Sequence, residues 1–183
     1  MNILTKLAIF LDPNSNPDAK IRYVKGDATQ PIGKGNKVII HCCNDIGAWG
    51  AGFVIALSKR SKAPELCYKE WHKTGKSTLS SGKFKLGSVQ FTPYFDASPF
   101  TVVANMIGQH GCGMDEKGNP PIRYSAIRKC LKKVRNHCLL TDASVHAPRF
   151  GSDLAGGDWN IIEKIIEEEL TMRGVSVTVY NWN

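Results

Sequence analysis

The chain has 183 residues, and 42% of them are hydrophobic, which suits one domain with a full core. No apolar run approaches the roughly 20 residues that a membrane helix needs, so we expect no membrane partner. The formal net charge of +8 is compatible with an acidic partner and excludes an acidic, self-repelling chain.

The first 20 residues are predicted to form an N-terminal extension, and residues 21–183 a single domain without internal repeats. Residues 13–17 form a linker rich in turn residues. The apolar segment at residues 7–11 ends at Asp12 and Pro13, too short for a signal peptide and without a small-residue cleavage site. We therefore expect a cytoplasmic protein.

Strand and helix patterns then alternate along the chain. Apolar or alternating segments typical of β-strands occur at residues 21–26, 37–43, 86–94, 100–107, 144–146 and 175–180. Helical spacing of apolar residues occurs at residues 53–60, 64–75, 122–139 and 160–172, the last with Gly174 as a C-terminal cap. This alternation predicts an α/β fold with helices on both faces of a sheet.

Two glycine-rich loops each leave a predicted strand and enter a predicted helix. They cover residues 44–52 and residues 151–159. Glycine lets backbone amides approach a ligand closely, and the following helix adds a positive N-terminal dipole. Two such loops predict a ligand with two adjacent phosphates. Neither loop contains the dinucleotide fingerprint or a P-loop lysine, which argues against a nicotinamide dehydrogenase and an ATPase.

The cysteine pattern predicts neither disulfides nor a metal site. None of the six cysteines forms a C-x-x-C pair, and all six are interpreted as reduced. His110 and Cys112 offer two potential metal ligands, but no second pair has ligand spacing. We therefore expect no metal and no cofactor.

Positive charge is concentrated in two stretches, residues 59–85 and residues 123–135. One interpretation is that these are solvated helix faces. The other is an electrostatic footprint for nucleic acid or another polyanion, since lysine-rich clusters bind phosphate backbones without sequence preference. The sequence leaves both open.

Four motifs together resemble the macrodomain family. They are Lys25-Gly26-Asp27-Ala28-Thr29, residues 39–52, residues 148–159 and the closing strand at residues 177–180. The resemblance covers about residues 21–183. It is closest to the branch with the terminal ADP-ribose protein glycohydrolase, the yeast-type ADP-ribose-1''-phosphate phosphatase and the antitoxins that strip ADP-ribose from DNA. It implies a three-layer α/β/α fold with a mixed central sheet of about six strands.

The resemblance also implies an ADP-ribose site. Asp27 would accept a hydrogen bond from the adenine amino group beside Ala28, Asn44 would hold the distal ribose, and Tyr180 and Asn181 would lie near the adenine. The two loops would wrap the diphosphate, and the other residues implied to bind are Gly47, Ala48, Trp49, Gly50, Ala51, Gly52, Gly108, Gly151, Ser152, Asp153, Leu154, Ala155 and Gly156. The alternatives are a turn residue for Asp27 and a core aromatic for Tyr180.

Catalytic residues are harder to place. The glycohydrolase of this branch uses a lysine after the fourth core strand and an aspartate in the second loop; residues 106–110 lack a lysine, and Ala155 stands at the aspartate position. The remaining candidates are Asn44, Asp158 and His41, the last at the position of a histidine associated with the phosphatase.

Each catalytic candidate has an alternative role. Strand alternation puts His41 and Asn44 on opposite faces unless the strand ends by Cys43, so His41 is alternatively a buried structural histidine. Asp158 is alternatively a helix N-cap. Asp153 is either a base that activates water or a loop variant that adds negative charge beside phosphates.

Three functions follow from these residues. The first is binding of ADP-ribose with hydrolysis of ADP-ribosyl linkages on protein or nucleic acid. The second is a non-catalytic reader of ADP-ribose, since the lysine is missing. The third is phosphatase action on ADP-ribose-1''-phosphate.

Overall fold

The computed structural model describes residues 16, 19–94 and 100–182, so most of the predicted extension lies outside the described residues. The strands are β1 (Arg22–Lys25), β2 (Asn36–Asn44), β3 (Val89–Pro93), β4 (Thr101–Gln109), β5 (Ala143–Pro148) and β6 (Val177–Asn181). The helices are α2 (Phe53–Arg60), α3 (Ala63–Thr74), α4 (Tyr124–Thr141) and α5 (Trp159–Glu169), followed by the 3-10 turn η1 (Thr171–Arg173).

The strands form one mixed sheet with the order β1-β6-β5-β2-β4-β3. All neighbouring pairs are parallel except β3 and β4, which are antiparallel. A six-stranded mixed sheet is what the sequence predicts. β2 is a central strand of nine residues whose apolar run, Val38-Ile39-Ile40, is fully buried, as expected of a strand covered on both faces.

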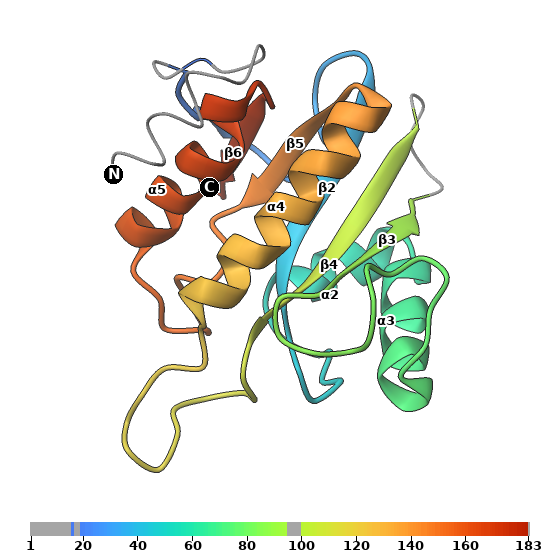
Figure 1. Ribbon diagram of the computed structural model, residues 1–183, viewed down its shortest axis with the longest axis vertical. Helices are drawn as coiled ribbons and strands as arrows, with labels where there is room; N and C mark the ends of the chain where they lie inside the picture. The colour runs from blue at the N-terminus through green and yellow to red at the C-terminus, as the bar shows by residue number, and fades with distance from the viewer. Residues whose placement is uncertain (1–15, 17–18, 95–99, 183) are drawn as a thin grey trace.

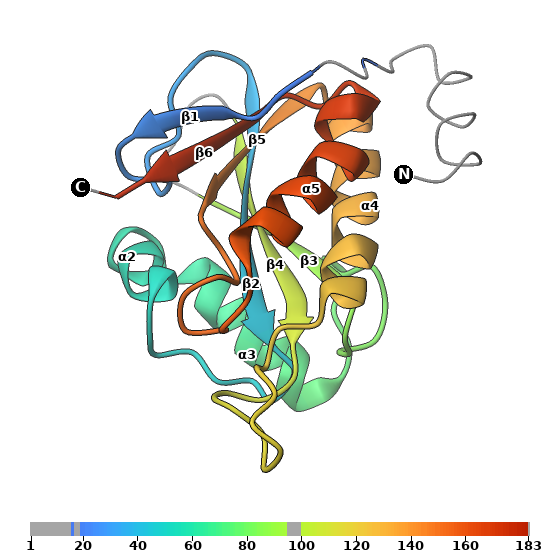
Figure 2. The same cartoon turned by 90° about the vertical axis from the view of Figure 1, so that its left-hand side faces the viewer.

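Helices cover both faces of the sheet, so the predicted three-layer α/β/α architecture is confirmed (Figures 1 and 2). Val38 and Ile40 belong to the core beneath α4 and α5. Ile39 and Cys43 point to the other face, where they join the smaller cores beneath α2 and α3. The opposite orientations of Cys42 and Cys43 follow the same alternation, and all six cysteines are free thiols, as predicted.

Several predicted elements have different ends in the structure, and the strand predicted over residues 86–94 is limited to Val89–Pro93. The strand predicted to end at Ile107 continues to Gln109, because Gln109 pairs with Asn44 in β2 and bridges to Ile122 in the segment before α4. Gly108 therefore lies in a strand and not in the loop predicted to follow it. The helix predicted over residues 160–172 ends at Glu169, and the turn η1 follows, capped by Gly174 at φ +83°.

β2 and β5 are parallel neighbours in the middle of the sheet, and the strands that follow them are added on opposite sides. From β2 the chain passes through α2 and α3 toward β3 and β4, whereas from β5 it passes through α5 toward β6 on the other side. The helices that follow β2, α2 and α3, lie on the opposite face of the sheet from α5, which follows β5 (Figure 2). Ligands of open α/β sheets bind beyond the carboxyl ends of the strands at such a point. Both glycine-rich loops start there.

No helix among the described residues is long and apolar enough to cross a membrane.

Candidate functional site

The first loop, residues 44–52, is organised by the side chain of Asn44. Its Oδ1 accepts hydrogen bonds from the amides of Ile46 (3.1 Å) and Ala48 (2.9 Å), and its Nδ2 donates to the Ala48 carbonyl oxygen (2.7 Å). The Tyr68 hydroxyl in α3 lies 2.9 Å from the same Oδ1 and 2.7 Å from the Asn44 carbonyl oxygen. One buried side chain therefore fixes the path of the loop.

A β-bulge brings Asn44 to this position. The register of β2 against β4 shifts between Cys43 and Asn44, which breaks the strict alternation of the strand. The Asn44 side chain therefore contacts α3 through Tyr68, on the same face of the sheet as Cys43. The sequence leaves open whether His41 and Asn44 lie on opposite faces of the sheet. The bulge places both side chains on the same face.

The second loop, residues 151–157, is held by backbone contacts instead. The Gly157 amide donates to the Gly151 carbonyl (2.9 Å), and the Gly156 amide donates to the Asp153 carbonyl (2.8 Å). A Cβ on Gly157 would lie 2.4 Å from the Gly151 carbonyl oxygen, so the ring closes only with glycine there. The carbonyl of Ala155 accepts from the Ile122 amide (3.3 Å) and ties the loop to the segment before α4.

The two loops approach each other beyond the sheet edge. A Cβ on Gly52 would lie 3.3 Å from Cδ1 of Leu154, whose side chain is otherwise exposed. Gly52 ends the first loop at φ +72° and is the N-cap of α2, so it combines an unusual backbone conformation with a helix N-terminus. The structure thus brings residues of two segments more than 100 positions apart close together.

The residues predicted near the adenine lie at the neighbouring end of β1 and β6. The Asp27 Oδ1 accepts from the Thr29 amide (2.8 Å), and its Oδ2 lies 3.7 Å from Nη2 of Arg60 in α2. Ala28 is buried. The turn role of Asp27 is therefore present, and it leaves the carboxylate paired with a half-exposed arginine.

Tyr180 and Asn181 occupy the end of β6. The Tyr180 hydroxyl accepts from the Ile32 amide (2.9 Å) and lies 2.8 Å from Nδ1 of His146. Its ring is buried and lies beneath Gly26, in the position of a core aromatic residue. The Asn181 Oδ1 accepts a hydrogen bond from Nε of Arg149 (2.8 Å), which belongs to the segment between β5 and the second loop.

The other two catalytic candidates, His41 and Asp158, also have structural partners. His41 is 2% exposed, its Nε2 lies 2.7 Å from Oδ1 of Asn105, and its ring packs against Trp49 and Phe53. Burial lowers the pKa of His41 to about 4, against the opposing effect of the Asn105 hydrogen bond. Asp158 is the N-cap of α5, and its Oδ1 accepts from the Asn160 amide (2.8 Å).

Gly108 and Asp153 complete the predicted positions. A Cβ on Gly108 would lie 2.3 Å from Cδ1 of Ile127 and 2.8 Å from the Cys42 sulfur, so this glycine permits close packing of β4 against α4. Asp153 is exposed, and its carbonyl oxygen closes the turn to Gly156.

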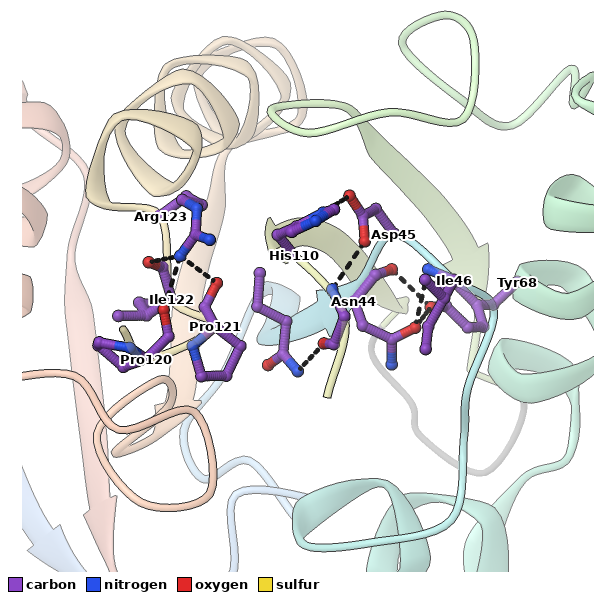
Figure 3. A network of polar contacts seen from close by, with 11 residues as sticks. Asn44, Asp45, Ile46, Tyr68, His110, Pro120, Pro121, Ile122 and Arg123 are labelled. Carbon is purple, nitrogen blue, oxygen red and sulfur yellow. Dashed lines mark hydrogen bonds and ion pairs between the residues drawn. The ribbon is translucent and has the colours of Figure 1, made fainter. Parts of the chain in front are cut away.

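The sequence interpretation missed a polar pair beside Asn44. Nδ1 of His110 lies 2.8 Å from Oδ2 of Asp45, and the Gly111 amide donates to Oδ1 of Asp45 (2.9 Å) (Figure 3). Asn44 pairs with Gln109 in the sheet, so Asp45 and His110 are the next residues on two adjacent strands. The position of both residues shortly after predicted strands was the signal in the sequence that could have indicated this pair.

Hydrogen bonds favour the ionised form of Asp45. Partial burial acts to raise its pKa, but the hydrogen bonds from His110 and the Gly111 amide outweigh that effect, and the pKa is lowered overall. Asp45 is therefore a carboxylate at neutral pH.

Arg123 and the segment before α4 close the other side of this region. Nη1 of Arg123 donates to the carbonyl oxygens of Pro120 (2.6 Å), Pro121 (3.1 Å) and Ile122 (2.9 Å) (Figure 3). The Pro121 carbonyl also accepts the His110 amide (2.8 Å).

Lysines of the second basic stretch contact Gly87, two residues after the end of the first. Nζ of Lys133 donates to the Gly87 carbonyl (2.8 Å), and Lys129 packs against the same glycine. Other cations of α4 are neutralised by acids of α5, since Arg128 lies 2.8 Å from both Glu168 and Glu169. Within the described part of the chain, no group of three or more histidine, cysteine or acidic residues is placed to hold a metal ion.

Comparisons with known proteins identify the fold. The chain is 53% identical to a Bacteroides thetaiotaomicron protein of unknown function, with 89% of this chain and 98% of that one covered and a TM-score of 0.82. It is 46% identical to a macrodomain protein from Streptomyces coelicolor, with 88% and 99% covered and a TM-score of 0.73. The chain belongs to the macrodomain family.

No protein-family model matches the sequence, and the comparisons also find more distant relatives. The macrodomain is 31% identical over 164 residues to the chromodomain-helicase-DNA-binding protein 1-like of Danio rerio, and spans 15% of that relative's length. It is 27% identical to an ADP-ribose 1''-phosphate phosphatase of Candida albicans, with 81% of this chain and 92% of that one covered. The Thermosipho africanus DarTG, solved in complex with ADP-ribose, is 14% identical with a TM-score of 0.65, covering 92% of this chain and 43% of that one.

Proposed function

We propose that this macrodomain binds ADP-ribose in the crevice between its two glycine-rich loops and hydrolyses ADP-ribosyl linkages. The observation that carries the proposal is the meeting of the loops, with Gly52 at the start of α2 close to Leu154 in the loop before α5. Loop amides and helix N-termini bind phosphate oxygens well, and two such loops match a diphosphate.

The ends of the crevice suit the two ends of the ligand. The carboxylate of Asp27 is an acceptor for the adenine amino group. Asn44 uses one Nδ2–H on the Ala48 carbonyl and retains a second for a hydroxyl of the distal ribose. Because Asn44 is 7% exposed and fixed by four hydrogen bonds, it presents that donor in one orientation.

Hydrolysis uses the same arrangement. Water attacks the anomeric carbon of the distal ribose while the loops hold the diphosphate, so much of the entropy of orienting the reactants is lost on binding. Loop amides stabilise negative charge on the diphosphate during the reaction. Relatives named for ADP-ribose 1''-phosphate phosphatase action and for a complex with ADP-ribose support this ligand class.

The leaving group is a protein side chain or a nucleic acid. Lys129 and Lys133 meet the loop that carries Lys83 and Lys85 at Gly87, which favours a polyanionic substrate. Binding of such a substrate should weaken as salt is raised, since bound cations displace counterions from the phosphate backbone.

The test is a panel of three substrates: a peptide ADP-ribosylated on glutamate, ADP-ribosylated DNA and ADP-ribose-1''-phosphate. We expect release of free ADP-ribose from the first, the second or both. Tight ADP-ribose binding by calorimetry without turnover of any substrate would instead assign a reader. Release of phosphate from the third substrate alone would assign a phosphatase, and neither binding nor turnover would overturn the proposal.

A further inference from the structure

We propose that His110 is the general base that activates the attacking water, with Asp45 as the positioning residue behind it. The inference rests on the proposed hydrolase function. It assigns water activation to a pair of residues that replaces the missing lysine with different chemistry.

The hydrogen bond between the pair fixes the tautomer of the neutral imidazole. The Asp45 carboxylate accepts the proton of Nδ1, so a neutral His110 carries its hydrogen on Nδ1 and its lone pair on Nε2. The His110 side chain is 62% exposed, against 17% for Asp45, and no group among the described residues hydrogen-bonds Nε2. A partly buried carboxylate thus orients an imidazole whose basic nitrogen faces solvent.

Contacts on both sides place His110 between the two loops. Its side chain hydrogen-bonds Asp45, the residue after Asn44, and its backbone amide donates to the carbonyl oxygen of Pro121. The same proline segment touches the second loop, because a Cβ on Gly156 would lie 2.9 Å from Cβ of Pro120. In Figure 3 the His110 and Asp45 side chains point toward one another beside Asn44. The distal ribose that Asn44 is proposed to hold therefore lies next to this histidine.

The proposed step balances as follows. Nε2 of His110 takes a proton from water while the water oxygen forms a bond to the anomeric carbon of the distal ribose. The bond from that carbon to the leaving group breaks, and the leaving group departs with the bonding pair. A carboxylate leaving group departs as an anion without needing a proton, and the imidazolium then releases its proton to solvent.

The competing explanation is that the pair is only a tether between the ends of β2 and β4. His110→Asn distinguishes the tether from the general base, because the asparagine amide can still donate to Asp45 but cannot accept a proton from water. His110→Ala removes both the tether and the base. His137→Ala is the matched control, since His137 lies in α4 and stacks on Phe91 away from the loops.

Turnover is measured on the panel substrate that the unsubstituted protein cleaves fastest. We expect kcat to fall by roughly 10²–10⁴-fold in both H110A and H110N with the affinity for ADP-ribose within about twofold. Added imidazole should partly restore H110A and leave the unsubstituted protein unchanged. Asp45→Asn should lower kcat by up to about 10⁴-fold, because the asparagine amide can hold the imidazole in the wrong tautomer.

Two outcomes overturn the assignment in different ways. If H110N keeps full turnover, or if imidazole fails to restore H110A, His110 is not the base, although the protein remains a hydrolase. If the unsubstituted protein cleaves no substrate, the proposed function fails, and the assignment of His110 fails with it.

Discussion

The two glycine-rich loops reach the same crevice but are built in different ways. The first loop is shaped by a side chain, because Asn44 satisfies two loop amides and a loop carbonyl. The second is shaped by the absence of side chains, because Gly157 lies against the Gly151 carbonyl where a Cβ would clash. The first loop should therefore lose its conformation when one polar side chain is removed, and the second loop when one methyl group is added.

Each of the two strands that lead into the loops carries a buried histidine, and acid should destabilise the fold through both of them. Burial is the main cause that lowers the pKa of His41 in β2 and of His146 in β5 to about 4. Between pH 6.5 and 4 the unfolded chain therefore binds more protons than the folded one, so stability falls as pH falls. Each histidine contributes at most about 1.4 kcal/mol per pH unit in this window. Urea unfolding at pH 7, 6 and 5 should show this slope, and a flat profile would contradict the burial of both histidines.

Loss of Asn44 should affect the first loop most strongly. Asn44→Ala leaves the Ile46 and Ala48 amides without their acceptor, whereas the Tyr68 hydroxyl keeps the carbonyl oxygen of residue 44, and we expect the free energy of unfolding to fall by about 3 kcal/mol. ADP-ribose binding should be lost as well. Asn44→Asp is the control, since it keeps the acceptor and removes the donor. It should keep more stability than Asn44→Ala in denaturant titrations and still bind ADP-ribose poorly. If either variant bound ADP-ribose as tightly as the unsubstituted protein, Asn44 would be excluded from the site.

A methyl group at Gly157 should affect the second loop next most strongly. The Cβ of Gly157→Ala would lie 2.4 Å from the Gly151 carbonyl oxygen, and relieving that clash should cost about 2 kcal/mol. Gly50→Ala in the first loop is the matched comparison, because its Cβ meets no atom within 4 Å. Its unfolding free energy should change by less than about 0.5 kcal/mol. Similar losses in the two variants would remove the contrast between the loops.

Asp158 tests whether the second loop supplies a carboxylate for chemistry or only a helix cap. Asp158→Ala should lower the unfolding free energy by about 1 kcal/mol, whereas Asp158→Asn should be nearly neutral because asparagine caps equally well. We expect Asp158→Asn to retain turnover. A loss of turnover at unchanged stability would give Asp158 the catalytic role that its position also allows.

Most of the fold was accessible from the sequence, because it depends on local patterns. The apolar run of β2, the spacing of apolar residues in α4 and the glycines after β2 and β5 each identify an element without reference to the rest of the chain. The macrodomain resemblance then predicted the three layers correctly. The end of β4 was predicted two residues too early, because its last residues pair with a segment that carries no strand pattern of its own.

The candidate site was less accessible, because its key features depend on contacts between distant segments. Asp45 and His110 are 65 positions apart and meet only because β2 and β4 are neighbours. The bulge after Cys43, which turns Asn44 toward Tyr68, has no sequence mark. The burial that gives His41 structural partners likewise appears only when Trp49 and Phe53 pack on it.

The most direct test of the crevice as the binding site is a crystal structure of the protein with ADP-ribose. We predict the diphosphate within hydrogen-bonding distance of amides in both loops, the adenine beside Asp27 and the distal ribose beside Asn44 and His110. ADP-ribose bound elsewhere on the protein, or an empty crevice at a saturating ligand concentration, would contradict the account.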